Sequence, residues 1–509
     1  MYIPSTQAAT SLLRRSIPQI PLSDAKFTLD ASGVAGIFGG DEAVSAMATV
    51  HVYQGRKWLG WYNSPGAYEI SKRYGQLAKS RLWSGLFPGP GTDPATLFEL
   101  DGQKGPRFKS FVSGTMLPDS GHLGALLMAE CEEIKGIPIA GRVSKPAVKE
   151  VKEEGSSDKD LASVQTLGKE VKDLEKSRLD PKTQLRLKKD AKRPTLVTVV
   201  NLDNVPPDTL FPTLPRRHSQ LFASIPIFAS VAACVLSGLF QDWWAFTMIL
   251  LGIVTSGWAC WVIGSGHFTF SHPIPAAGSP PGDGILESSS GVVVLIGEEG
   301  AVNAVTRGRF SLQFGSEPEY SNIGIASTML MIQFIAQLLL IPQATLFGQL
   351  MFVMSLGVSW GYNSWLSSLD KEKIQRKILM RKVLKLPEEN MSKFTVTTRT
   401  TMAVLVCLIL SRIDPPKVLD DNVEELARDG PEKILHYLIP NDTKVWNRFR
   451  RTIALQIIEN RSEFQLDCSD LVGLQDRDQK LLMTLCEDAE AARKAYHEHN
   501  MEAMTSRHR

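Results

Sequence analysis

The stretch SQLFASIPIFASVAACVLSGLFQDWWAFTMILLGIVTSGWACWVIG occupies residues 219–264, and Asp242 is its only charged residue. About 20 apolar residues in a helix are enough to cross the hydrocarbon core of a bilayer. The stretch is long enough for two such crossings. We therefore predict one span over 219–240 and a second over 243–263, joined by a very short turn at Asp242.

A second apolar stretch, residues 320–369, contains no charged side chain at all. It predicts two further spans, over 323–341 and 346–366, with a short turn between them. The hairpins 219–264 and 323–366 would then make a membrane protein with four transmembrane helices.

Aromatic and basic residues at the ends of these spans predict how the protein is oriented. Trp243 and Trp261 lie near opposite ends of the second span, as in the aromatic belts of membrane proteins. Arg216 and Arg217 precede the first span, and a basic helix follows the fourth, whereas neither hairpin turn contains Lys or Arg. The positive-inside rule therefore predicts that both termini and the loop 265–322 are cytoplasmic.

The remaining chain divides by composition into polar segments that resemble soluble protein. We expect a disordered N-terminus (1–23), a soluble α+β region (24–143), a charged flexible linker (144–193), a strand with a Pro-rich connector (194–218), a β-rich loop (265–322) and a C-terminal helical domain (367–509). The predicted fold class is a multi-span α-helical membrane protein with a cytoplasmic α+β region and a C-terminal all-helical domain.

The loop 265–322 contains three short β-prone runs, GVVVLIG, AVNAVT and RFSLQF, separated by Gly and charged residues. This pattern predicts a three-stranded meander. Small isolated sheets are marginally stable. We therefore expect the loop to pack with the strand predicted at 195–202 and with the N-terminal region.

A fifth apolar run, residues 402–411, lies between Arg399 and Arg412. The residues between these two charges make about 18 Å of helix, which is too short to cross a bilayer without snorkelling. We predict a buried core helix. A fifth span is the alternative, and glycosylation at Asn441 or Asn460 would indicate it.

Overall composition argues against several classes of protein. The chain has 56 Lys and Arg against 54 Asp and Glu, which does not favour a nucleic-acid-binding protein. Its six cysteines form no CxxC pair, so we expect no metal or other cofactor. The first 20 residues lack acidic side chains, which leaves a mitochondrial presequence as an alternative to a disordered N-terminus.

Polar residues inside the predicted spans are the first candidates for a site, and none of them is ionisable. At helical spacing they predict hydrogen bonds between helices, with a pore lining as the alternative. They are Gln333, Gln337, Ser355, Ser359 and Asn363.

The basic helix after the fourth span is the second candidate site. Its cations suit anionic lipid headgroups, and the alternative is that they only fix orientation while their apolar neighbours pack into the C-terminal core. They are Lys371, Lys373, Arg376, Lys377, Arg381, Lys382 and Lys385.

No catalytic motif is present in the sequence, so we expect a non-enzymatic membrane scaffold, tether or regulatory protein. Its partners would be the lipid bilayer and proteins on the cytoplasmic face. A passive channel or transporter is the first alternative, and a lipid-acting membrane enzyme is the second. The residues that such an enzyme could use are Asp41, Glu42, His51, His122 and His267.

Overall fold

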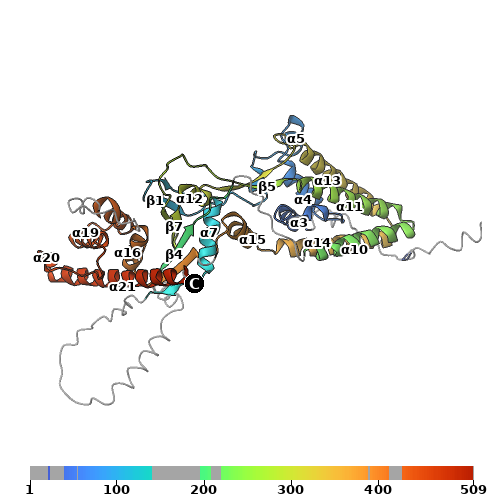
Figure 1. Ribbon diagram of the computed structural model, residues 1–509. Helices are drawn as coiled ribbons and strands as arrows, with labels where there is room; N and C mark the ends of the chain where they lie inside the picture. The colour runs from blue at the N-terminus through green and yellow to red at the C-terminus, as the bar shows by residue number, and fades with distance from the viewer. Residues whose placement is uncertain are drawn as a thin grey trace, which may run out of the picture.

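The computed structural model describes residues 21–22, 39–53, 55–139, 195–207, 219–387, 390–411 and 427–507. Three bodies follow one another along the molecule: a bundle of apolar helices, a central mixed sheet and a layer of C-terminal helices (Figure 1). The predicted linker 144–193 and the possible presequence 1–20 lie outside the described residues.

Four helices form the apolar bundle. They are α10 (Ser219–Leu239), α11 (Trp243–Ile263), α13 (Ser321–Leu340) and α14 (Leu346–Ser367). Within the described residues, three helices are long and apolar enough to cross a membrane, judged by length and composition: Leu221–Leu239, Trp243–Ile263 and Ser321–Gln343. The fourth helix, α14, has 22 residues, but polar side chains interrupt its apolar sequence.

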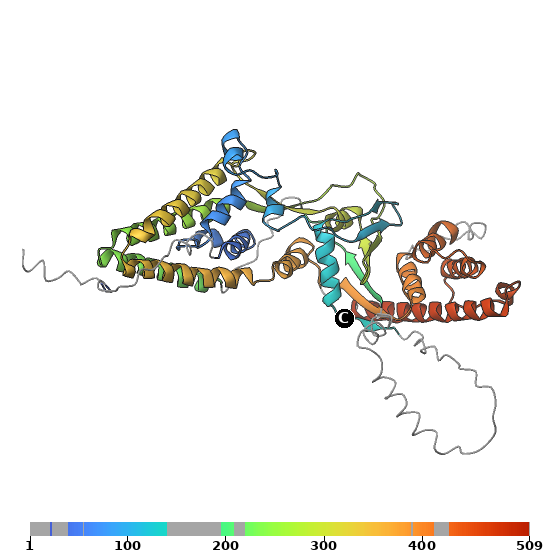
Figure 2. The ribbon, with the colours of Figure 1, turned by 180° about the vertical axis from the view of Figure 1, so that it is seen from behind.

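The two hairpins of the apolar bundle pack side by side. α10 lies along α14 and α11 lies along α13. The two pairs meet at the hairpin turns, where η2 (Ile341–Gln343) joins α13 to α14, and they diverge toward the sheet (Figures 1 and 2). Ile249, Ile341 and Phe352 are fully buried in the closed end.

N-terminal elements fill the space between the diverging pairs, as Figure 2 shows. They are α3 (Gly40–Ala48), the 3-10 turn η1 (Arg56–Trp58) and α4 (Ala67–Gly75). We expected residues 24–143 to form one region outside the spans, but 39–75 lies within the bundle. Small residues allow this burial: a Cβ on Gly66, where φ is 76°, would lie 2.7 Å from the Gly40 Cα.

A ribbon of two antiparallel strands connects the apolar bundle to the sheet. These strands are β5 (His267–Ser271) and β8 (Arg309–Gln313). Phe268, Phe270 and Phe310 of the ribbon are buried. Two short helices, α5 (Arg81–Leu86) and α6 (Pro94–Leu97), lie in the N-terminal chain between α4 and the sheet.

Seven strands of the described chain form one sheet, in the order β2-β1-β6-β7-β4-β9-β3. In chain order they are β1 (Arg107–Ser110), β2 (Met116–Leu117), β3 (Ile137–Pro138), β4 (Thr195–Leu202), β6 (Gly284–Glu287), β7 (Gly291–Gly297) and β9 (Met391–Val396). β6 pairs with the N-terminal strand β1, and β7 pairs in parallel with β4. The loop 265–322 therefore shares one sheet with the N-terminal region and with the strand expected at 195–202.

The predicted meander is wrong in its middle element. AVNAVT belongs to helix α12 (Glu299–Thr306), not to a strand. Ala301, Val302, Ala304 and Val305 are buried, and α12 packs against α7 (His122–Glu133). A spacing of three and four residues places all four on one helical face, so burial against α7 overrides the β propensity of the valines.

Alternate residues of the central strands face two separate cores. Val200 and Leu202 of β4 face the core shared with α7 and α15 (Lys371–Ile378). Val197 and Val199 face the core shared with α16 (Arg399–Leu410). Because side chains alternate along a strand, both faces of the sheet are covered by helices.

The C-terminal region is not all-helical, which corrects the prediction for 367–509. Residues Met391–Val396 form β9, which lies between β4 and β3 in the sheet. Residues 402–410 of the predicted run lie inside α16, where Ala403, Val404 and Leu405 are fully buried. The other elements are the π-turn η3 (Leu379–Val383), η6 (Arg428–Glu432), α18 (Lys433–Leu438), α19 (Lys444–Ile458), α20 (Cys468–Leu471) and α21 (Asp476–Arg507).

Candidate functional site

A re-entrant segment, residues 56–66, enters the apolar bundle from its open end and turns back into α4. It packs closely against α11 at several glycines, among them Gly60 of the segment and Gly252 of the helix. A Cβ on Gly60 would lie 2.3 Å from the Cβ of Cys260, and a Cβ on Gly252 would lie 2.0 Å from Asn63 Oδ1. An irregular backbone is tolerated inside a bundle when other protein groups satisfy its polar atoms.

Asn63 lies at the turn of this segment and contacts all four helices of the bundle. Its backbone amide donates to Ser230 Oγ of α10 at 3.0 Å, and its Nδ2 donates to Ser355 Oγ of α14 at 2.9 Å. Gln337 Nε2 of α13 donates to Asn63 Oδ1 at 3.3 Å, and Gly252 of α11 lies against the same oxygen. Asn63 thus links the four helices through its backbone amide and its side chain.

The polar residues predicted from the sequence are arranged around Asn63. Gln333 Nε2 donates to Gln337 Oε1 at 3.3 Å, and Gln333 accepts a hydrogen bond from Thr255 of α11. Ser355 accepts from Asn63, whereas Ser359 Oγ donates to the Ser355 carbonyl of its own helix at 2.8 Å. Four of the five predicted side chains therefore form hydrogen bonds with another segment of the chain, whereas Ser359 forms one within its own helix.

The fifth predicted residue, Asn363, contacts the re-entrant segment nearer the open end. Its Oδ1 accepts from the Tyr62 hydroxyl at 2.9 Å, and its Nδ2 donates to Ser64 Oγ at 3.1 Å. Arg56 is 4% exposed and donates to the Tyr362 hydroxyl at 2.7 Å. The sequence did not indicate Arg56 as a site residue, because it lies far along the chain from every apolar span.

A cavity of about 20 Å³ lies between these groups, lined in part by Arg56, Tyr62, Ser64, Cys260 and Asn363. That volume is enough for one water molecule. We call this row of hydrogen-bonded side chains, from Arg56 to Gln337, the polar row. Its members are satisfied mainly by one another, so the polar row holds the hairpins and the re-entrant segment together.

The residues considered for enzyme chemistry lie on separate elements. Asp41 and Glu42 are in the first turn of α3, and His267 begins β5. His51 is buried with its Nδ1 3.3 Å from the Gly266 carbonyl, and His122 Nε2 lies 2.9 Å from Gln375 Oε1. No group of three or more His, Cys, Asp or Glu side chains that could hold a metal occurs among the described residues.

The basic helix after the apolar bundle is attached to the sheet domain. Arg376 is 5% exposed and donates to Glu133 Oε1 of α7 at 2.7 Å. Lys371 Nζ lies 2.7 Å from Glu99 Oε2. Arg376 is therefore not available to lipid headgroups, contrary to the expectation for the full set. The exposed cations are Lys373, Lys377, Arg381, Lys382 and Lys385.

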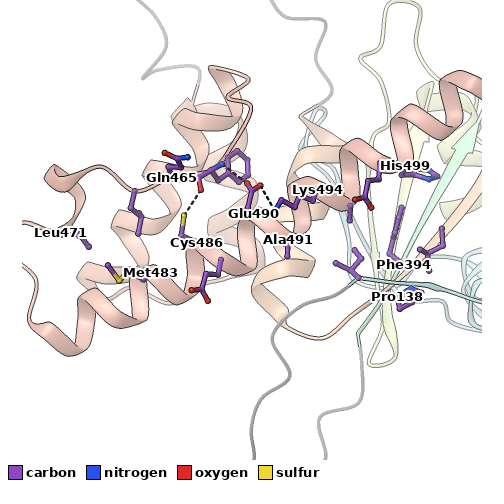
Figure 3. Close-up of a pocket in the computed structure, with 17 residues that line it drawn as sticks. Pro138, Phe394, Gln465, Leu471, Met483, Cys486, Glu490, Ala491, Lys494 and His499 are labelled. Atoms are coloured by element: carbon purple, nitrogen blue, oxygen red, sulfur yellow. Dashed lines mark hydrogen bonds and ion pairs between the residues drawn. The ribbon is translucent and has the colours of Figure 1, made fainter.

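One cavity among the described residues was not indicated by the sequence. It is a groove of about 970 Å³ between the sheet edge at β3 and helix α21 (Figure 3). Its apolar floor includes Ile137, Phe394, Phe464 and Met483. Only the tertiary structure brings these residues together, since they come from four elements that are distant in sequence.

The rim of this groove carries charge from α21. Glu487, Glu490 and Glu498 line it together with Lys494. Glu490 accepts two hydrogen bonds from Arg493 and one from the backbone amide of Phe464, which fixes the loop against the helix. The groove therefore has an apolar floor and a charged edge, where Glu490 is paired with Arg493 and Glu487 and Glu498 add further negative charge.

No protein-family model matches this chain, and no curated protein or solved structure matches it either. The function of the polar row and of the groove is therefore inferred from their own residues.

Proposed function

We propose that this protein is a non-enzymatic scaffold in which all four helices of the apolar bundle cross a membrane. The observation that carries the proposal is that a largely apolar bundle extends from one end of the molecule, while the sheet and the C-terminal helices lie together beyond its open end (Figure 1). The outward faces of the bundle carry exposed apolar side chains that water would not favour, among them Leu221, Phe228, Leu239, Ile332, Leu339 and Met354.

The length of the apolar bundle supports this proposal. Trp243 and Trp261 lie at opposite ends of α11, and both are exposed. Eighteen helical steps separate them, which is about 27 Å and close to the thickness of a bilayer core. Tryptophans favour the two interfaces of a membrane, so this spacing fits one full crossing.

The composition of α14 is also compatible with a span. Its polar side chains point inward: Gln349, Ser355, Ser359 and Asn363 are all buried. Met354, which is exposed, faces outward from the same helix. The average hydropathy of α14 is thus lowered by residues that would never meet lipid, because they belong to the bundle interior.

Basic residues near the open end support a cytoplasmic location for the polar bodies. The exposed cations that follow α14, such as Lys373 and Lys377, lie at this end, and the hairpin turns carry no Lys or Arg. By the positive-inside rule, the open end faces the cytoplasm. Both termini and the loop 265–322 would then be cytoplasmic.

Thiol labelling of sealed vesicles tests this topology. Cys468 is exposed and reports on the C-terminal helices, and Gln343→Cys reports on the turn between α13 and α14. A membrane-impermeant maleimide should label position 343 only from outside and Cys468 only after the vesicles are opened. Labelling of both positions from one side, or release of the protein by alkaline carbonate, would refute the four-span anchor.

The groove beside α21 is the surface of this scaffold that we propose binds a partner. Its apolar floor and its excess of Glu over Lys suit a polypeptide segment that has an apolar face and basic flanks. A labelled Lys/Leu amphipathic peptide, titrated against the protein in neutral-lipid nanodiscs, should bind more weakly to Met483→Gln. Leu481→Gln is the control, because Leu481 is exposed on α21 but does not line the groove. Equal affinities would rule out this use of the groove.

A passive channel is the second candidate, and the polar row is the observation that favours it. Hydrogen-bonded side chains extend from Arg56 at the open end to Gln337, deep in the bundle. The cavity beside them is only about 20 Å³, so transport would require the helices to separate. Ion or solute flux into proteoliposomes that is unchanged by Gln333→Leu and Asn363→Leu would exclude this candidate.

A further inference from the structure

Helix α5 (Arg81–Leu86) carries apolar side chains that nothing in the described structure covers. Leu82 is 64% exposed and Leu86 is 52% exposed. Each residue of this helix except Trp83 is classed as exposed. Two leucines one turn apart thus form a small apolar face on the outside of the molecule.

A cap closes the first turn of α5, and two contacts fix the helix beside the first turn of α13. Ser80 Oγ caps the helix by accepting from the Trp83 amide at 3.2 Å. The Lys79 amide donates to the Glu319 carbonyl at 2.8 Å, just before α13 begins. The Trp83 ring packs on Gly324, where an added Cβ would come within 2.7 Å of the ring. The position of α5 is therefore set by the start of an apolar helix.

The helix on which α5 packs, α13, also has exposed apolar side chains. Ile325 in the first turns of α13 is 44% exposed, and Ile332 and Leu339 follow farther along the same helix at 57% and 62%. In the proposed topology, α13 enters the bilayer close to Ser321. Leu82 and Leu86 would then lie at the depth where headgroups meet acyl chains.

The chain segment that contains α5 is positively charged, and Glu319, whose carbonyl accepts from the Lys79 amide, is an acidic neighbour just before α13. From Lys72 to Thr92 the chain contains no Asp or Glu, and it contains four cations. Lys79 and Arg81 are exposed next to the two leucines. A short helix with cations, leucines and a tryptophan has the composition of a segment that lies in a membrane interface.

We propose that α5 lies in the interfacial zone of the cytoplasmic leaflet, with Leu82 and Leu86 among the acyl chains and Lys79 and Arg81 beside anionic headgroups. This inference rests on the proposed function, because it requires α13 to enter the membrane. It adds a lipid-binding element that is distinct from the spans and from the basic helix α15. An interfacial helix buries its apolar face to a depth of about 5–10 Å.

Depth-dependent fluorescence quenching tests the inference in the full-length protein. An environment-sensitive dye is attached to Leu82→Cys in a Cys468→Ser background, with the protein in phosphatidylcholine vesicles containing phosphatidylserine. Val231→Cys on α10 is the span reference, and Val112→Cys in the turn between β1 and β2 is the aqueous control, since both residues are exposed. We expect stronger quenching at position 82 by a headgroup nitroxide than by a deep acyl-chain nitroxide, and the reverse order at position 231.

The possible outcomes distinguish the lipid contact of α5 from the membrane anchor formed by the apolar bundle. If position 231 is quenched and position 82 behaves like position 112, the inference about α5 is wrong and the anchor stands. If neither 82 nor 231 is quenched, both proposals fail. Dye at position 82 that is shielded from both nitroxides and from aqueous iodide would mean that protein covers α5, which also overturns the inference.

A charge variant provides a second measurement. Its two substitutions are at exposed positions, so the fold should be retained. Lys79→Gln with Arg81→Gln should reduce the increase in quenching at position 82 that phosphatidylserine produces. Lys104→Gln is the matched control, because Lys104 is exposed and lies outside α5. An identical response of the two variants to phosphatidylserine would contradict headgroup binding by α5.

Discussion

Thr345 donates two hydrogen bonds to the carboxylate of Asp242, from its backbone amide at 2.8 Å and from its hydroxyl at 2.6 Å. Asp242 also accepts from the Ala245 amide at 3.1 Å and is only 3% exposed. One carboxylate thus caps α11 and ties the first hairpin to the beginning of α14. The turn between α10 and α11 is therefore held by tertiary hydrogen bonds and is not merely a connection.

Gly348→Ala should destabilise the protein by disturbing this contact. The added Cβ would lie 2.0 Å from Asp242 Oδ2 and 2.7 Å from the Ala245 Cβ. Overpacking of this kind costs about 1–3 kcal/mol. We expect a lower Tm in detergent. Gly357→Ala is the control on the same helix, since its Cβ would meet nothing within 4 Å. Equal Tm values for the two variants would show that the contact between Asp242 and the start of α14 does not stabilise the protein.

Gln337→Leu should weaken the packing of the re-entrant segment. Gln337 donates to Asn63 Oδ1 and to the Met248 carbonyl, and it is 3% exposed. Hydrogen bonds between helices in a membrane contribute about 0.6–2 kcal/mol each. Gln343→Leu makes the same chemical change at an exposed position. Limited proteolysis between residues 50 and 66 should be faster in Gln337→Leu alone, and equal rates would contradict the role of Gln337.

The free energy of unfolding should decrease in mild acid because His51 is buried. Burial lowers the pKa of His51 from 6.5 to about 4, an effect that the Gly266 carbonyl partly offsets. Phe98 and Phe314 lie against the ring, at 4.6 Å and 6.0 Å between centroids. Between these two pH values the unfolded chain binds a proton that the folded chain does not. The contribution of neutral His51 is therefore complete above pH 6.5 and is lost as the pH falls toward 4, by about 3 kcal/mol.

His51→Phe measures this effect, because phenylalanine has a similar shape and cannot titrate. As the pH falls from 6.5 to 4, the Tm of the wild type should fall relative to the Tm of His51→Phe. His436→Phe is the control at a largely exposed site. A pH-independent difference for His51→Phe would mean that the ring is solvated in solution.

Arg376→Gln should loosen the contact between α15 and α7. Its guanidinium donates to Glu133 and to the Ala129 carbonyl, and lies 3.5 Å from Glu130. Loss of a buried cation that holds such partners costs up to about 3–5 kcal/mol, and less here because Glu133 is half exposed. Faster amide exchange in α7 is the expected result. Lys377→Gln, at an exposed neighbour, should leave that exchange unchanged.

Local sequence patterns correctly predicted the helices and strands whose form is set by their own residues. β4 occupies residues 195–202, at which the β-branched run TLVTVVNL predicted a strand. The apolar runs gave the helices of the bundle to within a few residues, because about 20 uninterrupted apolar residues leave few other choices. Elements whose form depends on a neighbour were predicted wrongly. α12 is a helix because it packs on α7, and β9 is a strand because β4 and β3 pair with it.

The apolar hairpins, the turn at Asp242 and the inward polar residues such as Gln337 were determined by the sequence, through hydropathy and helical spacing alone. Only the tertiary structure decided that Asn63 enters the bundle and that β3 and α21 enclose a groove. Asn63 and Gln337 are 274 positions apart. A local sequence pattern does not indicate which polar groups form hydrogen bonds with each other, because packing between distant parts of the chain decides the pairing.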